Sequence, residues 1–356
     1  MKKSLLALAA LSAFATAAQA QSSVTIYGAV GASTNSYKTN GADVANSFQN
    51  ASRDHLSTTA LGLRGTEDLG QGNTAFFNLE GDLSMSGVVG ANATYAATAA
   101  GTTTNIFNRQ AHVGVSTKIG TFSFGRQNDS VKDTEGLAQV YNLSDNLHNN
   151  TAVGHRIANA YKYATPTIAG LSATYTYSNN PANSDNTAAD GTVTHNSFAV
   201  RYKVPFNGGI DLAYAQGEES TTAGNSADDI KTTRISAQTK VMGATIGYAY
   251  TENKNKAAGT NKNDSNLFSV NIPFMGAYEF KAHYITSDAQ GSVVSSTNGV
   301  GDDAGFAKYK GDGYGLMAVY NVSKRTAAYV GYADFDADGG NTNDQKVTTL
   351  GLVHKF

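Results

Sequence analysis

The chain has 356 residues, 37 of them glycine, no cysteine, and a formal net charge of −2 at neutral pH. So mild a charge argues against a nucleic-acid-binding protein, and the lack of cysteine excludes a disulfide-stabilised scaffold. Nineteen tyrosines, fifteen phenylalanines and only four prolines favour a chain rich in strands and turns.

The first twenty residues have the three parts of a secretory signal peptide. Lys2 and Lys3 form a charged start, residues 5–18 are an apolar run too short to span a bilayer, and Ala-Gln-Ala at 18–20 is typical of a cleavage site. We therefore predict a signal peptide over 1–20 and a mature domain over 21–356. Loss of the two lysines would change the formal charge from −2 to −4. No later apolar run is long enough for a transmembrane helix.

From Ser23 onward, apolar and polar side chains alternate with a period of two, which predicts strands with one apolar and one polar face. In 171–178, for example, leucine, alanine and tyrosine alternate with serine and threonine. The other faces are mostly Ser, Thr, Gly, Ala and Asn. The pattern predicts sixteen strands, over 23–36, 52–66, 74–86, 105–117, 120–127, 155–164, 169–178, 193–204, 209–217, 230–240, 243–252, 265–273, 277–287, 308–322, 326–335 and 346–356.

The connections between these strands alternate between short turns and long loops rich in Asn, Asp, Ser, Thr and Gly. A soluble β-sandwich also alternates, but it must bury one apolar face against another. A transmembrane barrel needs an even strand number, about ten residues per strand, and short turns at one rim with long loops at the other. Charged mid-strand residues such as Glu80, Arg201 and Lys281 also require a wet polar face. We predict an all-β fold, a 16-stranded antiparallel transmembrane β-barrel wide enough for an aqueous channel.

Several stretches in order along the chain resemble one family. They include SSVTIYG (22–28), LGLRGTEDLGQGNTAFFNLEG (61–81), NRQAHVGV (108–115), GTFSFGRQ (120–127), RIANAYKYATPTIAG (156–170), NVSKRT (321–326) and LGLVHKF (350–356). The chain is similar to the general diffusion porins of Gram-negative bacteria, in the β-proteobacterial branch. The resemblance implies a homotrimer in the cell outer membrane that lets ions and small hydrophilic solutes diffuse passively. It implies no enzyme activity and no cofactor.

The resemblance also implies that the third long loop, about 128–154, folds into the lumen and narrows it. Acidic residues on that loop would face basic residues on the wall and create a transverse field. The expected acidic set is Asp129, Asp133, Glu135 and Asp145, and the expected basic set is Arg109, Arg126, Arg156 and Lys162. Arg156 and Lys162 share a strand phase. Arg109 and Arg126 share the phase of apolar Val113 and Phe124, so a bulge at Gly114 or Gly125 would have to reset it.

The chain ends on an aromatic residue, Phe356. With Leu350 and Leu352 it falls on one face of the last strand, while Val353 and Lys355 fall on the other. We expect the first face to meet outer-membrane lipid and lipopolysaccharide, with Phe356 in the aromatic belt at the rim. By resemblance, this ending is also the signal read by the outer-membrane assembly machinery.

Other functional classes have weaker support. The seven histidines have no metal-ligand spacing and no G-x-S-x-G is present, so we expect no metal site and no hydrolase. The stretch 336–344 resembles a calcium loop but lacks its final glutamate, which favours a solvated loop. A solute-specific channel with a dense lining of aromatic or arginine side chains remains an alternative. A receptor or adhesin role for the long loops could coexist with a pore.

Overall fold

The computed structural model describes residues 23–39, 42–49, 56–83, 106–139, 141, 153, 156–179, 193–204, 209–221, 230–255, 262–290, 310–338 and 344–356. The predicted signal peptide over 1–20 and Asp145 lie outside these ranges. No helix within the described part of the chain is both long and apolar enough to cross a membrane. The described residues form one short 3-10 helix, η1 (Lys132–Leu137), and strands.

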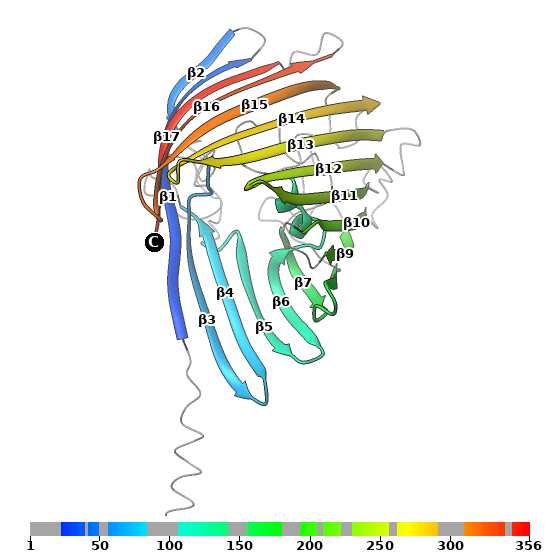
Figure 1. Cartoon of the computed structure of the whole chain (residues 1–356). Coiled ribbons are helices and arrows are strands. Elements are labelled where there is room, and N and C mark those ends of the chain that lie inside the picture. Colours follow the sequence, from blue (N-terminus) through cyan, green and yellow to red (C-terminus); the bar gives the residue numbers. More distant parts are fainter. Residues whose placement is uncertain are drawn as a thin grey trace, which may run out of the picture.

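The strands are β1 (Ser23–Thr39), β2 (Ala42–Gln49), β3 (Ala60–Gly70), β4 (Asn73–Asp82), β5 (Gln110–Thr117), β6 (Gly120–Asn128), β7 (Arg156–Ala164), β8 (Leu171–Ser178), β9 (Val193–Lys203), β10 (Asp211–Thr221), β11 (Ile230–Val241), β12 (Ala244–Asn255), β13 (Lys262–Phe274), β14 (Tyr278–Gln290), β15 (Gly311–Asn321), β16 (Thr326–Ala337) and β17 (Gln345–Lys355). From β3 onward each strand pairs with the next. β17 also pairs antiparallel with β1, so the sheet closes into a barrel (Figure 1). Closure pairs both edges of β1 and of every described strand from β3 to β17, which removes the free edges of an open sheet.

β2 and β3 share one strand position. β3 pairs with β1 along Ser23–Ala29, and β2 pairs with the same strand along Ser33–Thr39. The seventeen strands therefore fill sixteen positions, which confirms the predicted 16-stranded barrel. The predicted second strand (52–66) ends too early, because β3 continues to Gly70. Gly70 and the next two residues have positive φ angles and make a tight hairpin turn there.

The two faces of the barrel wall differ in chemistry, as the sequence alternation predicts. On β9, Phe198, Val200 and Tyr202 are 37, 39 and 41% exposed, whereas Ser197 and Ala199 are buried on the other side of the wall. The same alternation of exposed apolar residues continues on β10, β15 and β17. A continuous apolar outer surface without free backbone groups is the condition for spanning a bilayer.

The inner face of β13 to β17 departs from the expected small polar lining. Leu267, Ile285, Met317, Phe335 and Val347 point inward there and are buried in one apolar cluster with smaller neighbours. Ala138 and Tyr141 from the segment after β6 belong to the same cluster, and Leu56 packs against it. These apolar side chains share the inner face with polar ones such as Ser269 and His283, and Ala138, Tyr141 and Leu56 pack against them.

The last residue takes part in barrel closure. The backbone N–H of Phe356 donates to the carbonyl of Gly28 at 3.0 Å, and the N–H of Gly28 donates to the carbonyl of Phe356 at 3.2 Å. Leu350, Leu352 and Phe356 are exposed on the outer face, and Val353 is buried on the inner face. The orientation predicted for the final strand is therefore confirmed.

Candidate functional site

The segment Asp129–Gln139, which contains η1, lies against the inner face of β8 to β12 (Figure 1). At its start, the Ser130 hydroxyl lies 3.1 Å from the Thr176 hydroxyl of β8. At the end of η1, the side-chain amide of Gln238 on β11 donates to the carbonyl of Leu137 at 3.1 Å. The segment is therefore attached to the wall at both ends of its helical turn.

Two glycines on the inner face let this segment approach the wall closely. A Cβ atom on Gly217 would lie 2.7 Å from the side chain of Val153 and 3.0 Å from that of Val131. A Cβ atom on Gly247 would lie 2.6 Å from the carbonyl oxygen of Leu137. Contacts this short do not occur for real Cβ atoms, so the path of the segment depends on glycine at these positions.

A buried histidine connects the segment to two strands. His195 of β9 has its Nε2 atom 3.2 Å from Asp129 Oδ2 and its Nδ1 atom 3.1 Å from Glu219 Oε1 of β10. His195 and Asp129 are fully buried, and Glu219 is nearly so. Asp129 also accepts a hydrogen bond from the backbone N–H of Lys132 at 2.7 Å, which begins η1. Asp129, expected to line the pore, therefore holds the segment to the wall instead of facing water.

The two other acidic residues of the segment that the structure describes remain closer to the lumen. Asp133, whose side chain is 34% exposed, accepts a hydrogen bond from the ammonium group of Lys162 on β7. The same ammonium donates to the carbonyl of Asn128 at 3.0 Å. Glu135 pairs with Lys132 within η1 at 3.1 Å. The predicted pairing of loop acids with wall bases is present in the contact between Asp133 and Lys162.

Arg109 lies inside the barrel in a carboxylate pair. Its Nε atom is 2.5 Å from Glu80 Oε1, and its Nη1 atom is 3.1 Å from Asp82 Oδ1. Because β5 begins at Gln110, Arg109 is outside the strand ladder and its side chain is not bound to the phase of Val113. Two carboxylates offset the charge of Arg109, so this part of the wall is less positive than the sequence suggests.

The shared phase predicted for Arg156 and Lys162 is wrong. Lys162 pairs with buried Ser123 on the inner side, but the register between β6 and β7 then shifts by one residue on β7. Asn159, at this shift, has a positive φ angle of 52°. The extra residue changes the phase between the two cations. Arg156, the first residue of β7, is nevertheless close enough to Glu80 for their charges to interact.

Arg126 does not gain the phase reset expected for it. It pairs with Ala111 in unbroken register with the pair of Val113 and Phe124, whose side chains are exposed on the outer face. Gly125 has a φ angle of 119°, but the extra residue of the register shift is on β7, and Ser123 and Gln127 are both buried on the inner side, so the phase of β6 is unchanged. The Nε atom of Arg126 donates to the carbonyl of Asn108. In the ladder, Arg126 therefore occupies an outer-face position.

Two wall arginines near the segment were not among the expected site residues. Arg201 on β9 is partly exposed and close enough to Asp133 for their charges to interact. Arg234 on β11 is fully buried, interacts electrostatically with Glu135, and donates to the Thr251 hydroxyl at 2.8 Å. Both side chains alternate with the outward-facing apolar residues of their strands. This alternation is the sequence signal that could have placed them on the inner face.

The described part of the loop reaches further along the wall at Tyr141. Its ring stacks on that of His283 of β14, with centroids 4.5 Å apart and an interplanar angle of 12°. A Cβ atom on Gly315 of β15 would lie 2.7 Å from the Tyr141 hydroxyl. Burial raises the pKa of the Tyr141 phenol further above physiological pH.

A closed sixteen-position barrel with an apolar outer face, and with charged side chains around a segment attached to its inner face, defines an outer-membrane β-barrel channel. The chain belongs to the Gram-negative porin family, whose sequence profile matches residues 7–340. Outer membrane porin protein 32 of Delftia acidovorans is 29% identical over 373 residues, covering 100% of this chain and 93% of that relative. Major outer membrane protein P.IB of Neisseria lactamica is 27% identical, with complete coverage of both.

Solved structures show the same fold. An anion-selective porin from Comamonas acidovorans superposes with a TM-score of 0.71 at 22% identity, covering 94% of this chain and all of that one. The trimer form of OmpT, an outer membrane protein of Vibrio cholerae, gives a TM-score of 0.64 at 13% identity and covers 94% of this chain and 99% of that one. The protein is an outer-membrane pore for passive diffusion of ions and small hydrophilic solutes.

Proposed function

We propose that the segment Asp129–Gln139 forms the constriction of this pore, and that charges on its lumen side set the ion preference. The ion pair of Asp133 with Lys162 carries this proposal, because it joins the segment to a different strand from those on which η1 packs. Arg201, whose guanidinium pairs with Asp211, is close enough to Asp133 for their charges to interact. Opposite charges across a narrow aqueous path orient dipolar solutes and disfavour apolar ones.

The remaining expected site residues take different parts in this proposal. Arg109 and Arg156 act with Glu80 and Asp82 as a balanced charge group beside the path. Asp129 anchors the segment, and Glu135 balances Lys132. Arg126 and Asp145 contribute to selectivity only if their side chains reach the same water. A reversal-potential measurement on a variant of each tests this directly.

We propose further that the mature protein is a homotrimer without enzymatic activity. The trimer form of a structural neighbour and the continuous apolar outer face support subunit association in lipid. Residues 1–20 would be removed on export. Phe356 would serve as a signal for the assembly machinery, and the outer face would contact membrane lipid and lipopolysaccharide.

Planar-bilayer conductance of the purified protein tests the central proposal. A general diffusion pore gives a current that rises linearly with salt concentration. A trimer with three open pores closes in three equal conductance steps. A solute-specific channel instead saturates and is blocked by one class of solute. Saturation with potassium chloride alone, or a monomer on a non-denaturing detergent gel, would contradict the proposed general pore or the proposed trimer respectively.

A further inference from the structure

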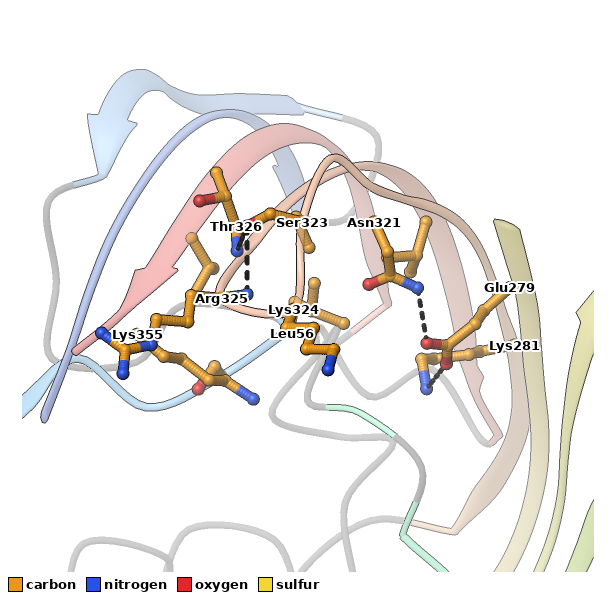
Figure 2. Close-up of a pocket in the computed structure, with 13 residues that line it drawn as sticks. Leu56, Glu279, Lys281, Asn321, Ser323, Lys324, Arg325, Thr326 and Lys355 are labelled. Carbon is orange, nitrogen blue, oxygen red and sulfur yellow. Dashed lines mark hydrogen bonds and ion pairs between the residues drawn. The ribbon is translucent and has the colours of Figure 1, made fainter. Parts of the chain in front are cut away.

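A second polar site lies apart from η1, at the rim with the short turns. Residues from β14 to β17 and from the segment before β3 enclose a cavity of about 170 Å³ inside the barrel (Figure 2). Three basic side chains, Lys324, Arg325 and Lys355, line it together with Lys281 and Glu279. Short turns lie on the periplasmic side in barrels of this class, so the cavity faces the periplasm.

The charges of the cavity do not balance. Lys281 Nζ lies 2.8 Å from Glu279 Oε2, and the Asn321 side chain donates to Glu279 Oε1 at 2.9 Å. The one acidic residue of the lining is therefore already paired. Lys324 and Lys355 form no side-chain ion pair among the described residues. Figure 2 shows Lys324 and Lys355 among the residues that line the cavity.

The backbone holds two of these cations in place. The backbone N–H of Lys355 donates to the carbonyl of Arg325 at 2.8 Å, which ties the end of β17 to the turn before β16. The Ser323 hydroxyl accepts hydrogen bonds from the N–H groups of Arg325 and Thr326, at 3.1 and 3.0 Å. The cavity is thus built on a fixed turn, so the backbone that carries its excess positive charge is already ordered before any ligand arrives.

Four apolar side chains complete the lining together with polar Ser57, Asn321, Ser323 and Thr326. Val319 and Val353 are buried in the wall, Ala327 is beside them, and Leu56 closes the cavity from the segment before β3. A ligand that suits both the cations and the apolar residues of the lining carries a carboxylate and a short aliphatic part. Inorganic ions such as chloride carry the negative charge but no aliphatic part. Sugars carry no charge for the cations and little aliphatic surface.

We propose that this cavity is a binding site for small aliphatic carboxylates at the periplasmic mouth of the pore. It goes beyond passive diffusion, because a solute held at the mouth is concentrated there before it leaves or enters the lumen. The site is built from different residues than the constriction. The proposal rests on the proposed pore only in requiring an open channel, and conductance in potassium chloride alone reports that separately.

Succinate is the probe, with 1,4-butanediol as a neutral control of similar length. We expect succinate, added on both sides of a bilayer, to reduce the chloride current of single channels in a saturable way, and butanediol to have no such effect. The triple variant K324Q/R325Q/K355Q should raise the half-saturating succinate concentration by about tenfold. Lys118→Gln, which removes a cation from another turn at the same rim, is the matched control and should leave it unchanged.

Three results would overturn the proposal: a current that succinate changes only linearly, an unchanged half-saturation in the triple variant, or an equal loss in Lys118→Gln. If the triple variant does not assemble, Arg325→Gln and Lys355→Gln are measured singly. Calorimetric titration of the detergent-solubilised wild-type protein with succinate then gives an independent readout. Absence of measurable heat together with unchanged single variants would count against the site.

Discussion

His195 gives the sharpest test of how the constriction segment is held. The side chain connects Asp129 of the segment with Glu219 of β10, and all three groups are almost completely buried. In the variant His195→Gln, one amide group replaces two ring nitrogens on opposite sides of the imidazole. It can reach one carboxylate, so the other is left buried without its partner.

Removing one partner of a buried charged pair costs about 3 kcal/mol. Because 1.4 kcal/mol corresponds to a factor of ten, the ratio of detached to attached segment should rise about 150-fold. The strands themselves keep their ladder hydrogen bonds, so this cost acts on the segment and not on the barrel. We therefore expect assembly to proceed normally while the segment moves more often.

Single-channel recording under applied voltage measures this motion. The variant should show more frequent closing steps and close at lower voltage than wild type. His354→Gln, which changes an exposed histidine on β17, is the matched control and should behave as wild type. A second pair of changes, S130C/T176C, replaces hydroxyls that are 3.1 Å apart, and the chain contains no other cysteine.

In the His195→Gln background, the oxidised disulfide should restore steady conductance, and reduction should remove it again. Closing steps that persist in the oxidised protein would place the motion elsewhere in the chain. An H195Q channel as steady as wild type would refute the reasoning altogether, since the buried bridge would then contribute nothing to holding the segment.

Three further outcomes are expected. Gly247→Val places a side chain against the carbonyl of Leu137 and should cost about 2 kcal/mol, seen as a lower dissociation temperature on heated detergent gels; an unchanged temperature would mean that the segment can shift freely. Asp133→Asn should move the reversal potential toward anion preference and Lys162→Gln toward cation preference, and equal potentials in both would remove this pair from the pore. Deleting Phe356 should reduce the yield of assembled protein, whereas a Phe356→Ala variant keeps its closing backbone bonds; normal yield for the deletion would contradict a role in assembly.

The wall of the barrel was predictable because alternation is a local property of the chain. On β14, Tyr278 and Phe280 are exposed outside while Lys281 and His283 are buried inside, as the sequence pattern indicates. A lipid surface demands this regularity at every second residue. The number of strands followed from the same signal, although β2 adds a second segment to one position.

The site was less predictable because it depends on contacts between distant parts of the chain. The alternation around Lys162 gives no sign of the extra residue at Asn159, which changes the phase of Arg156. Asp129 and His195 are far apart in the sequence, and no local pattern predicts their contact. The sequence therefore did not indicate that Asp129 is buried. The apolar inner wall, with Met317 among its members, looks like any strand interior until a covering segment is placed on it.

The pairing of β17 with β1 also sets a condition on the order of events in assembly. Thr39 pairs with Gln345 and Gly28 bonds to Phe356, so the first strand lacks its neighbour on one side until the last residues of the chain arrive. A chain cut short anywhere before β17 would present two open edges, and lipid cannot satisfy their backbone groups. A chain without β17 therefore cannot close the barrel and is not stable in the membrane.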